Sequence, residues 1–194
     1  MFILIDNYDS FTYNVYHLFA IHSDEEVRVI RNDAMSVKEI KALNPKAILI
    51  SPGPGEPKDA GICVEMIKEL KADVPMFGVC LGLQSIAEAF GATIIRAPLP
   101  MHGKVSQITH KDDRLLKDIP EKFDVTRYHS LCIAPDTLPK DIVATAYSDD
   151  GVIQAINHKK YPLYAVQFHP ESIRTEYGGR MIQNFLKLVE DFYQ

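Results

Sequence analysis

The sequence predicts an α/β protein with a central, mostly parallel sheet flanked by helices and a smaller antiparallel sheet. Two patterns indicate this class. In the first half, apolar runs typical of buried strands alternate with segments of helical periodicity. In the second half, the runs are short and separated by turn residues, which favours antiparallel pairing. The chain has 194 residues and no linker or low-complexity tract, so we expect one domain spanning residues 1–194.

Strands and helices alternate through the first half. Four helices are expected here. Two span residues 10–21 and 81–90; one begins at a capping box that opens at Ser36, and one has an apolar stripe that includes Met66. This β-α-β order implies parallel strands with helices on both faces of the sheet. The strands, each apolar enough to be buried on both faces, are expected at residues 2–5, 27–30, 47–50 and 76–79.

The second half is expected to pair antiparallel. Residues 149–151 (Asp-Asp-Gly) form a hairpin-turn sequence between two short β-type runs. The chain closes with a helix whose apolar face carries Met181, Phe185, Leu188 and Val189. The antiparallel strands are expected at residues 104–108, 142–147, 152–157 and 163–168.

Composition and charge argue against a nucleic-acid-binding, membrane-spanning or disulfide-rich protein. The apolar content of 46% and charged content of 24% are ordinary for a soluble protein, and the net charge of −5 argues against a nucleic-acid surface. The sequence shows no apolar run long enough to span a bilayer and no signal peptide. The three cysteines cannot all pair, and no metal-ligand spacing occurs. We therefore expect a cytoplasmic protein without a disulfide framework, a metal or a cofactor.

The most informative segment is Gly78-Val79-Cys80-Leu81-Gly82, which joins an apolar strand to a helix. Glycines on both sides of a cysteine are typical of a nucleophile elbow, because side chains would collide across the tight turn. Cys80 would then lie at a helix N-terminus, whose dipole favours the thiolate. A buried structural cysteine is the alternative, and we expect Cys63 and Cys132 to be of that kind.

A histidine and a carboxylate follow the last β-type run. His169 stands at a strand end, where open α/β sheets place their ligands. Glu171 lies two residues further along an extended segment and would share a face with His169. Cys80 as nucleophile, His169 as base and Glu171 as orienting group form a triad that predicts acyl transfer on an amide or ester. A surface histidine is the alternative.

Residues 51–55 (Ser-Pro-Gly-Pro-Gly) follow the strand at residues 47–50. A plain turn is the alternative. The segment is not a phosphate loop, because the pattern G-x-x-x-x-G-K is absent and the prolines lack amide donors. The N–H groups of Gly53 and Leu81 would together form a two-donor oxyanion hole. Other polar segments are less specific: residues 6–10 suit a helix cap with Asp9 or Ser10, residues 102–104 a turn, and residues 127–131 a surface segment.

Together these segments resemble the class I glutamine amidotransferases over essentially the whole chain. The shared motifs are residues 51–55, residues 78–82 with Gln84, and residues 168–172. Within the family, one branch contains the glutaminase subunits of anthranilate synthase (component II) and of para-aminobenzoate synthase. The segments similar to that branch are residues 5–14, 101–104 and 127–131.

The resemblance implies that Cys80 attacks the side-chain amide of glutamine, ammonia leaves, and water hydrolyses the resulting thioester. His169 would transfer the protons, and Glu171 would orient His169. Glutamine and its oxyanion would be held by Gly53, Pro54, Gly55, Leu81, Gln84, Ser130 and Leu131, with the backbone of the last two at the α-amino and α-carboxyl end. Leu83 departs from the family, where a polar residue often follows the elbow, and this bears on specificity rather than on the triad.

The resemblance also implies a partner. The chain has no room for a chorismate-binding domain, so ammonia would pass to a separate, larger synthase subunit in a hetero-oligomer. That complex would make anthranilate for tryptophan, 4-amino-4-deoxychorismate for folate, or both. Residues 6–10 and 102–104 are the expected docking segments. Alternatives are the glutaminase subunit of another synthase such as GMP synthetase, a cysteine hydrolase of similar fold, and a regulatory subunit with a vestigial site.

Overall fold

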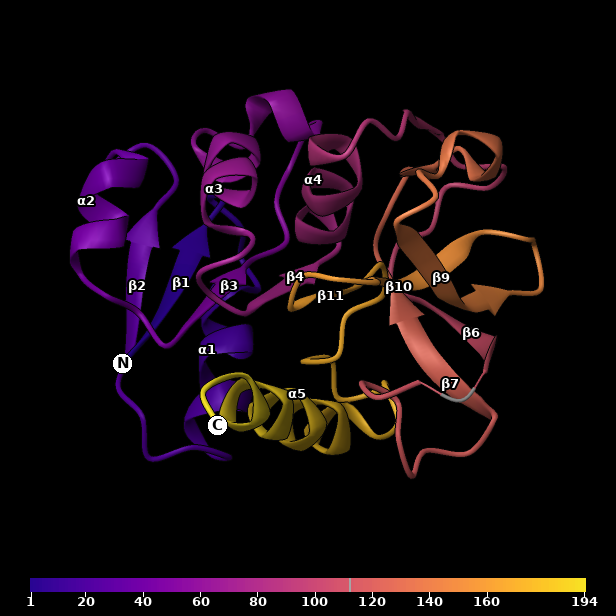
Figure 1. Ribbon diagram of the computed structural model, residues 1–194. Helices are drawn as coiled ribbons and strands as arrows, with labels where there is room; N and C mark the ends of the chain where they lie inside the picture. Colours follow the sequence, from indigo (N-terminus) through magenta and orange to yellow (C-terminus); the bar gives the residue numbers. More distant parts are fainter. Residues whose placement is uncertain (112) are drawn as a thin grey trace.

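A computed structural model describes residues 1–111 and 113–194, and a large sheet crosses its centre (Figure 1). The strands within those residues are β1 (Phe2–Asp6), β2 (Val27–Arg31), β3 (Ala47–Ile50), β4 (Met76–Val79), β5 (Ile94–Arg96), β6 (Lys104–His110), β7 (Lys122–Arg127), β8 (Leu131–Ile133), β9 (Ile142–Ser148), β10 (Ile153–His158) and β11 (Leu163–Val166). Among the described residues, a nine-stranded sheet has the order β2-β1-β3-β4-β11-β10-β9-β6-β7, and β5 pairs with β8 in a separate antiparallel sheet.

The large sheet changes character at β11. The neighbours from β2 through β1, β3 and β4 to β11 are all parallel. From β11 through β10, β9 and β6 to β7, every pair is antiparallel. The predicted class is confirmed, but the antiparallel prediction for residues 163–168 is wrong on one side, because β11 pairs parallel with β4. This pairing brings the carboxyl ends of β4 and β11 to the same edge of the sheet.

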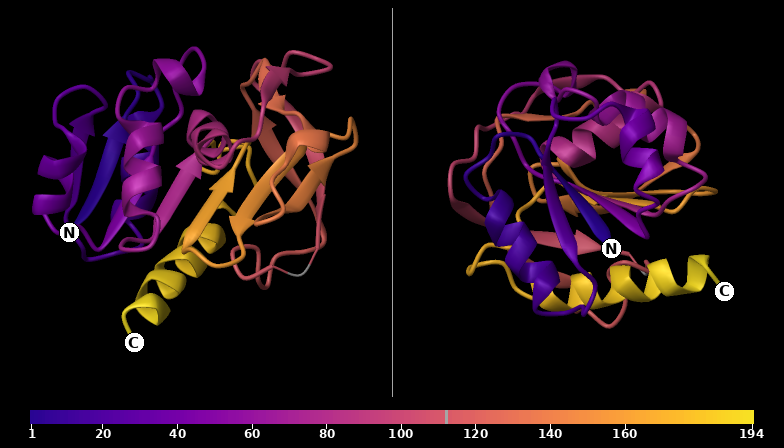
Figure 2. Two further views of the ribbon diagram at one scale, coloured as in Figure 1. Left: turned by 45° about the horizontal axis from the view of Figure 1, so that its top comes forward. Right: turned by 90° about the vertical axis from the view of Figure 1, so that its left-hand side faces the viewer.

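Helices cover both faces of the sheet, as the alternation of elements predicts. One face carries α1 (Thr12–Ala20) and α5 (Gly178–Phe192), and the other carries α2 (Val37–Ala42), α3 (Cys63–Leu70) and α4 (Leu81–Ala89) (Figure 2). Short 3-10 turns occur at Pro57–Asp59 and Pro135–Thr137. The predicted capping box before α2 is present, with Ser36 and Glu39 as its partners.

The start of α1 differs from the predicted cap. The helix begins at Thr12, and the residue in the N-cap position is Phe11, which makes no side-chain capping bond. The Asp9 carboxylate instead accepts the N–H of Phe11 at 2.8 Å, in a turn before the helix. Asp6 is turned toward the helix as well, because Thr12 Oγ1 donates to its Oδ1 at 2.7 Å.

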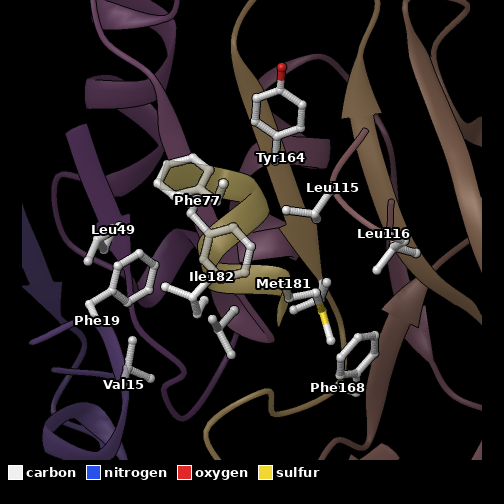
Figure 3. Packing of buried hydrophobic residues seen from close by; sticks show 14 of the residues in the cluster. Val15, Phe19, Leu49, Phe77, Leu115, Leu116, Tyr164, Phe168, Met181 and Ile182 are labelled. Carbon is white, nitrogen blue, oxygen red and sulfur yellow. The ribbon is translucent and has the colours of Figure 1, made fainter. Parts of the chain in front are cut away.

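Two apolar clusters hold the layers together, one on each face, and alternate residues of β1 belong to different clusters. Figure 3 shows Phe19 of α1 and Phe77 of β4 in the cluster that α5 covers. The rings of Phe19, Phe77 and Phe185 lie with centroids 5.8, 6.0 and 5.2 Å apart. Burying each such ring contributes about 1.5–3 kcal/mol. This packing holds α1 and α5 against the sheet.

Within the described part of the chain, no helix is both long and apolar enough to cross a membrane.

Candidate active site

The turn after β4 places Cys80 at the carboxyl edge of the sheet. Cys80 takes φ of 55° and ψ of −101°, a conformation that residues with a Cβ rarely adopt, and Leu81 begins α4 directly after it. A Cβ on Gly78 would lie 2.6 Å from the backbone carbon of Gly82, and one on Gly82 would lie 2.6 Å from the carbonyl oxygen of Ile50. The strand–turn–helix geometry predicted for these residues is therefore present, and both glycines are required for it.

The Cys80 thiol is buried against the end of β11, with 6% of the residue exposed. The Cys80 N–H donates to the carbonyl oxygen of Val166 at 2.8 Å, which ties the turn to that strand. Gln167 Nε2 donates to the sulfur at 3.5 Å. An amide donor and a helix N-terminus are the partners that a negatively charged sulfur needs.

His169 and Glu171 form a buried pair beside this turn. His169 Nδ1 lies 2.6 Å from Glu171 Oε1, and the two side chains are 2% and 0% exposed. The His169 N–H donates to the carbonyl of Thr126 at 3.0 Å, and Thr175 Oγ1 donates to the carbonyl of His169 at 2.6 Å. These bonds hold the backbone and the ring in one orientation, so the predicted pairing of His169 with Glu171 is present in the structure.

Aromatic rings enclose the imidazole of His169. The rings of Phe11 and Tyr128 pack edge-on against it, with centroids 5.5 and 5.1 Å from that of the imidazole. Both rings also contact each other at 5.0 Å. Since these rings exclude water from two sides, the His169–Glu171 interaction is screened little.

The protonation of His169 follows from its neighbours. Burial by itself would lower the pKa of His169, but the Cys80 thiol and the Glu171 carboxylate outweigh burial and raise that pKa to about 10. Nδ1 faces Glu171, so Nε2 is the ring nitrogen on the Cys80 side; among residues 1–111 and 113–194, no atom meets hydrogen-bond geometry with it. The imidazole therefore holds a proton at neutral pH, and Nε2 is available to a substrate atom.

The loop at residues 51–55 lies against the start of α4. A Cβ on Gly53 would lie 2.5 Å from Asn7 Cβ and 2.8 Å from Leu81 Cδ2, so a larger residue does not fit there. Asn7 holds the loop with two bonds, from its N–H to Ser51 Oγ and from its Nδ2 to the Ser51 carbonyl, both at 2.9 Å. Gly53 and Leu81 are thus neighbours, which is what a shared oxyanion hole requires.

Two adjoining cavities open beside this loop, and Gly55 lines both. One, of about 610 Å³, is also lined by the predicted binding residues Ser130 and Leu131. The other, of about 400 Å³, is also lined by Pro54 and Leu81. A larger cavity of about 740 Å³ is lined by Phe2, where β1 begins, and therefore belongs to the opposite edge of the sheet.

Gln84 connects the cavity wall to the cysteine. Its Nε2 donates to the carbonyl of Leu131 and to Gln167 Oε1, both at 3.1 Å. Leu83, the position that departs from the family, is fully buried in the apolar cluster beneath α4. It does not line the cavities described above.

Sequence reasoning missed the roles of Asn7 and Gln167. Gln167 carried a usable signal, because it is a polar residue directly after an apolar strand and directly before His169. Asn7 carried none, since its partner Ser51 is 44 residues away. Segment 127–131 is also not the surface segment expected, because Arg127 and His129 are buried. Within the described residues, no group of three or more His, Cys, Asp or Glu side chains is placed to hold a metal.

Comparison with known proteins agrees with this geometry. The model of the family described as glutamine amidotransferase class-I matches residues 3–189. The chain belongs to the class I glutamine amidotransferase family.

Two relatives within this family are similar over nearly their whole length. "Anthranilate synthase component 2" of Azospirillum brasilense is 49% identical over 187 residues, which cover 96% of this chain and 95% of that protein. "Aminodeoxychorismate/anthranilate synthase component 2" of Bacillus subtilis is 46% identical over 187 residues, 96% of each chain. A solved structure from Thermoplasma acidophilum, described as a GMP synthase component, superposes with a TM-score of 0.87 at 24% identity, over 99% of this chain and 94% of that one. That likeness supports the fold alone.

Proposed function

We propose that this protein hydrolyses glutamine to glutamate and ammonia and delivers the ammonia to a chorismate-aminating synthase. The observation that carries the proposal is the buried His169–Glu171 pair, 2.6 Å apart, beside Cys80 in its strained turn. The names of the two relatives favour a chorismate-aminating partner over a GMP synthetase. Whether the product is anthranilate, 4-amino-4-deoxychorismate or both depends on the synthase subunit that binds.

In the first step, the Cys80 thiolate attacks the side-chain amide carbon of glutamine. The carbonyl oxygen becomes an oxyanion, which the N–H groups of Gly53 and Leu81 stabilise. The carbon–nitrogen bond then breaks as His169 transfers its Nε2 proton to the departing nitrogen, and ammonia leaves. A histidine that is protonated before the substrate arrives is suited to this role as general acid.

In the second step, His169 accepts a proton from water, and the resulting hydroxide attacks the glutamyl thioester. The carbon–sulfur bond breaks, glutamate is released, and the Cys80 thiolate and the His169 imidazolium are restored. Glu171 stabilises the imidazolium before the first step and after the second, and it keeps Nε2 of the ring toward the sulfur throughout. No cofactor enters either step.

The amino-acid end of glutamine would occupy the cavity of about 610 Å³ that Ser130 and Leu131 line. Backbone groups of these two residues would bind its α-amino and α-carboxyl groups. Pro54 and Gly55 form the neighbouring wall, and Gln84 supports Leu131 from behind. The cavity is of ordinary size for a small-molecule site.

The synthase would dock over the same edge of the sheet. Ile173, which follows the triad by two residues, is fully exposed, and Tyr8 is 54% exposed. His102 packs edge-on against Tyr128, which in turn contacts His169. A synthase docked on this edge would cover these exposed apolar side chains. We therefore retain residues 6–10 and 102–104 as docking segments, in one domain of residues 1–194 that acts in the cytoplasm.

Labelling with an electrophilic glutamine analogue tests the chemistry. The intact protein should be modified once, at Cys80, and excess glutamine should slow the modification. Cys132→Ala is the matched control, because Cys132 is also a buried free cysteine and its loss should not change labelling. If glutamine does not slow the labelling, a cysteine hydrolase is favoured. If Cys80 is not labelled at all, a vestigial site is favoured. Co-purification and glutamate release with each candidate synthase would identify the partner.

A further inference from the structure

A buried arginine stands four residues before Leu131, which lines the proposed glutamine cavity. Arg127, at the end of β7, is 1% exposed, and a buried charge is costly unless it is paired and hydrogen-bonded. Its Nη2 donates to Asp150 Oδ2 at 2.9 Å, its Nη1 to Ser106 Oγ at 3.3 Å, and its Nε to His129 Nε2 at 3.0 Å. The guanidinium is thus held from three places: β6, the turn between β9 and β10, and the segment between β7 and β8.

The contact with Arg127 determines which nitrogen of His129 carries the proton. A guanidinium only donates, so His129 Nε2 must accept, and the proton must be on Nδ1. Burial first, and then the charge of Arg127, lower the pKa of His129 to about 4, so this neutral form persists at neutral pH. Nδ1 lies 2.9 Å from the carbonyl oxygen of Leu131 and donates to it.

The Leu131 carbonyl is where this network reaches the cavity. It accepts a second bond from Gln84 Nε2 at 3.1 Å, and Leu131 itself lines the cavity of about 610 Å³. The other end of the network lies in the β9–β10 hairpin turn, where Ser148 Oγ donates to Asp150 Oδ1 at 2.5 Å. A hairpin turn is therefore connected by hydrogen bonds to the backbone proposed to bind glutamine.

We propose that Arg127 and His129 are positioning residues, which set the backbone of residues 130–131 for binding of glutamine, and that Asp150 fixes Arg127. This inference rests on the proposed glutaminase function. His129 bonds directly to the Leu131 carbonyl, whereas it is connected to Cys80 only through Gln84 and Gln167. Loss of the His129 contact should therefore raise KM for glutamine more than it lowers kcat.

Two substitutions test the contacts of the two ring nitrogens of His129 one at a time. In His129→Asn, the side-chain amide occupies the place of Nδ1 and can still donate to the Leu131 carbonyl. In His129→Gln, the amide oxygen occupies the place of Nε2 and can accept from Arg127, but the bond to Leu131 is lost. If His129 only fills space, the two variants should bind glutamine equally well. The comparison therefore distinguishes a positioning role from a packing role.

Glutamine affinity would be measured by calorimetry in a Cys80→Ser background, which cannot turn over substrate, and KM and kcat in the parent. We expect His129→Asn to remain within about 3-fold of the reference affinity and His129→Gln to bind about 10-fold more weakly, the usual scale for one lost hydrogen bond to a buried group. Asp150→Asn, which loosens Arg127 but leaves the bond from His129 to Leu131, should weaken binding by about 3-fold. Asp73→Ala, which removes the exposed Lys41–Asp73 ion pair, is the control and should change nothing.

The outcomes separate the two proposals. If the Cys80→Ser protein binds no glutamine, the proposed function itself is wrong. If that protein binds glutamine but His129→Asn and His129→Gln bind equally well, or if Asp150→Asn lowers only kcat, the positioning role is wrong and the glutaminase function stands. Circular dichroism and the unfolding midpoint show which variants fold. If His129→Gln does not fold, the test is Asp150→Asn, whose amide oxygen can still accept from Arg127.

Discussion

Gln167 Nε2 lies 3.5 Å from the sulfur of Cys80, within hydrogen-bonding reach of the nucleophile. Gln167 is fully buried, and its amide oxygen accepts from Gln84 Nε2 at 3.1 Å, which turns the NH₂ group toward the sulfur. A side chain held in this way costs little reorganisation when charge develops on the sulfur.

Replacing Gln167 by Met should slow thioester formation by about 10- to 100-fold, because a hydrogen bond to a charged group contributes roughly 1.5–3 kcal/mol. Methionine keeps a similar volume but cannot donate. Rapid-quench measurement of the first turnover reports this step directly. Gln183→Met, on the exposed side of α5, is the control. An unchanged first turnover would show that the amide only fills space.

Cys80→Ala should abolish glutamine-dependent product formation by the complex and leave ammonia-dependent formation intact. The physical reason is that Cys80 serves only to release ammonia, and the synthase performs the amination. Product formation would be measured with glutamine and, separately, with ammonium salts at raised pH. Failure of ammonium to rescue the variant complex would contradict this division of labour.

Glu171→Ala should cost less activity than His169→Ala. His169 transfers protons itself, which contributes roughly 10²–10⁴-fold, whereas Glu171 acts through the imidazole. Single-turnover thioester formation by the two variants gives the comparison. Equal losses would assign Glu171 a more direct role.

The same Glu171→Ala variant checks the pKa of His169. Because that pKa is raised to about 10 in the folded protein, protonation of His169 stabilises the fold fully below about pH 6.5, and this stabilisation is lost as pH rises toward 10. Removal of Glu171 should weaken this stabilisation of the fold by the protonated His169. The difference in free energy of unfolding between wild type and variant should therefore be largest near pH 6 and shrink toward pH 10. Denaturant titrations across that range measure it, and a difference that grows with pH would contradict the assignment.

Gly53→Ala should lower kcat by about 10²–10³-fold with a smaller effect on KM, the usual cost of losing one oxyanion donor. The added Cβ would lie 2.5 Å from Asn7 Cβ, so the loop must move and its N–H with it. Steady-state glutamate release provides both parameters. Gly91→Asn, at a glycine with φ of 101° and nothing within 4 Å of an added Cβ, controls for the backbone strain of substituting a turn glycine. A variant with only a raised KM would place the loop in binding alone.

The free subunit should be a weak glutaminase, and its synthase should activate it, because ammonia released into water is protonated and lost as a nucleophile. Charge reversal in Lys104→Glu should weaken that activation several-fold and leave the basal rate unchanged, since Lys104 is exposed at the expected docking segment. Lys38→Glu, on α2 near the far edge of the sheet, is the matched control. Glutamate release would be measured across a titration of the synthase. A free subunit that already works at full rate would contradict the coupling.

The elements predicted correctly from sequence depend on neighbouring residues. The turn at Cys80 follows from the two glycines beside it, the His169–Glu171 pair from a spacing of two residues, and the hairpin at residues 149–151 from its Asp-Asp-Gly turn. The parallel strands of the first half follow from their alternation with helices. In each case the physical cause lies within a few residues of its effect.

Other features were decided only by the tertiary structure, because their partners are distant in the chain. The parallel pairing of β11 with β4 brings His169 to Cys80, and no local pattern distinguishes it from antiparallel pairing. The hydrogen bond between Asn7 and Ser51 joins residues 44 positions apart, and that between Gln167 and Cys80 joins residues 87 positions apart. Arg127 resembles a surface residue in sequence, since arginine is usually exposed. Its burial depends on Asp150, which the β9–β10 hairpin places beside it, and a charge is stable in the interior only once such a partner has been brought to it by the fold.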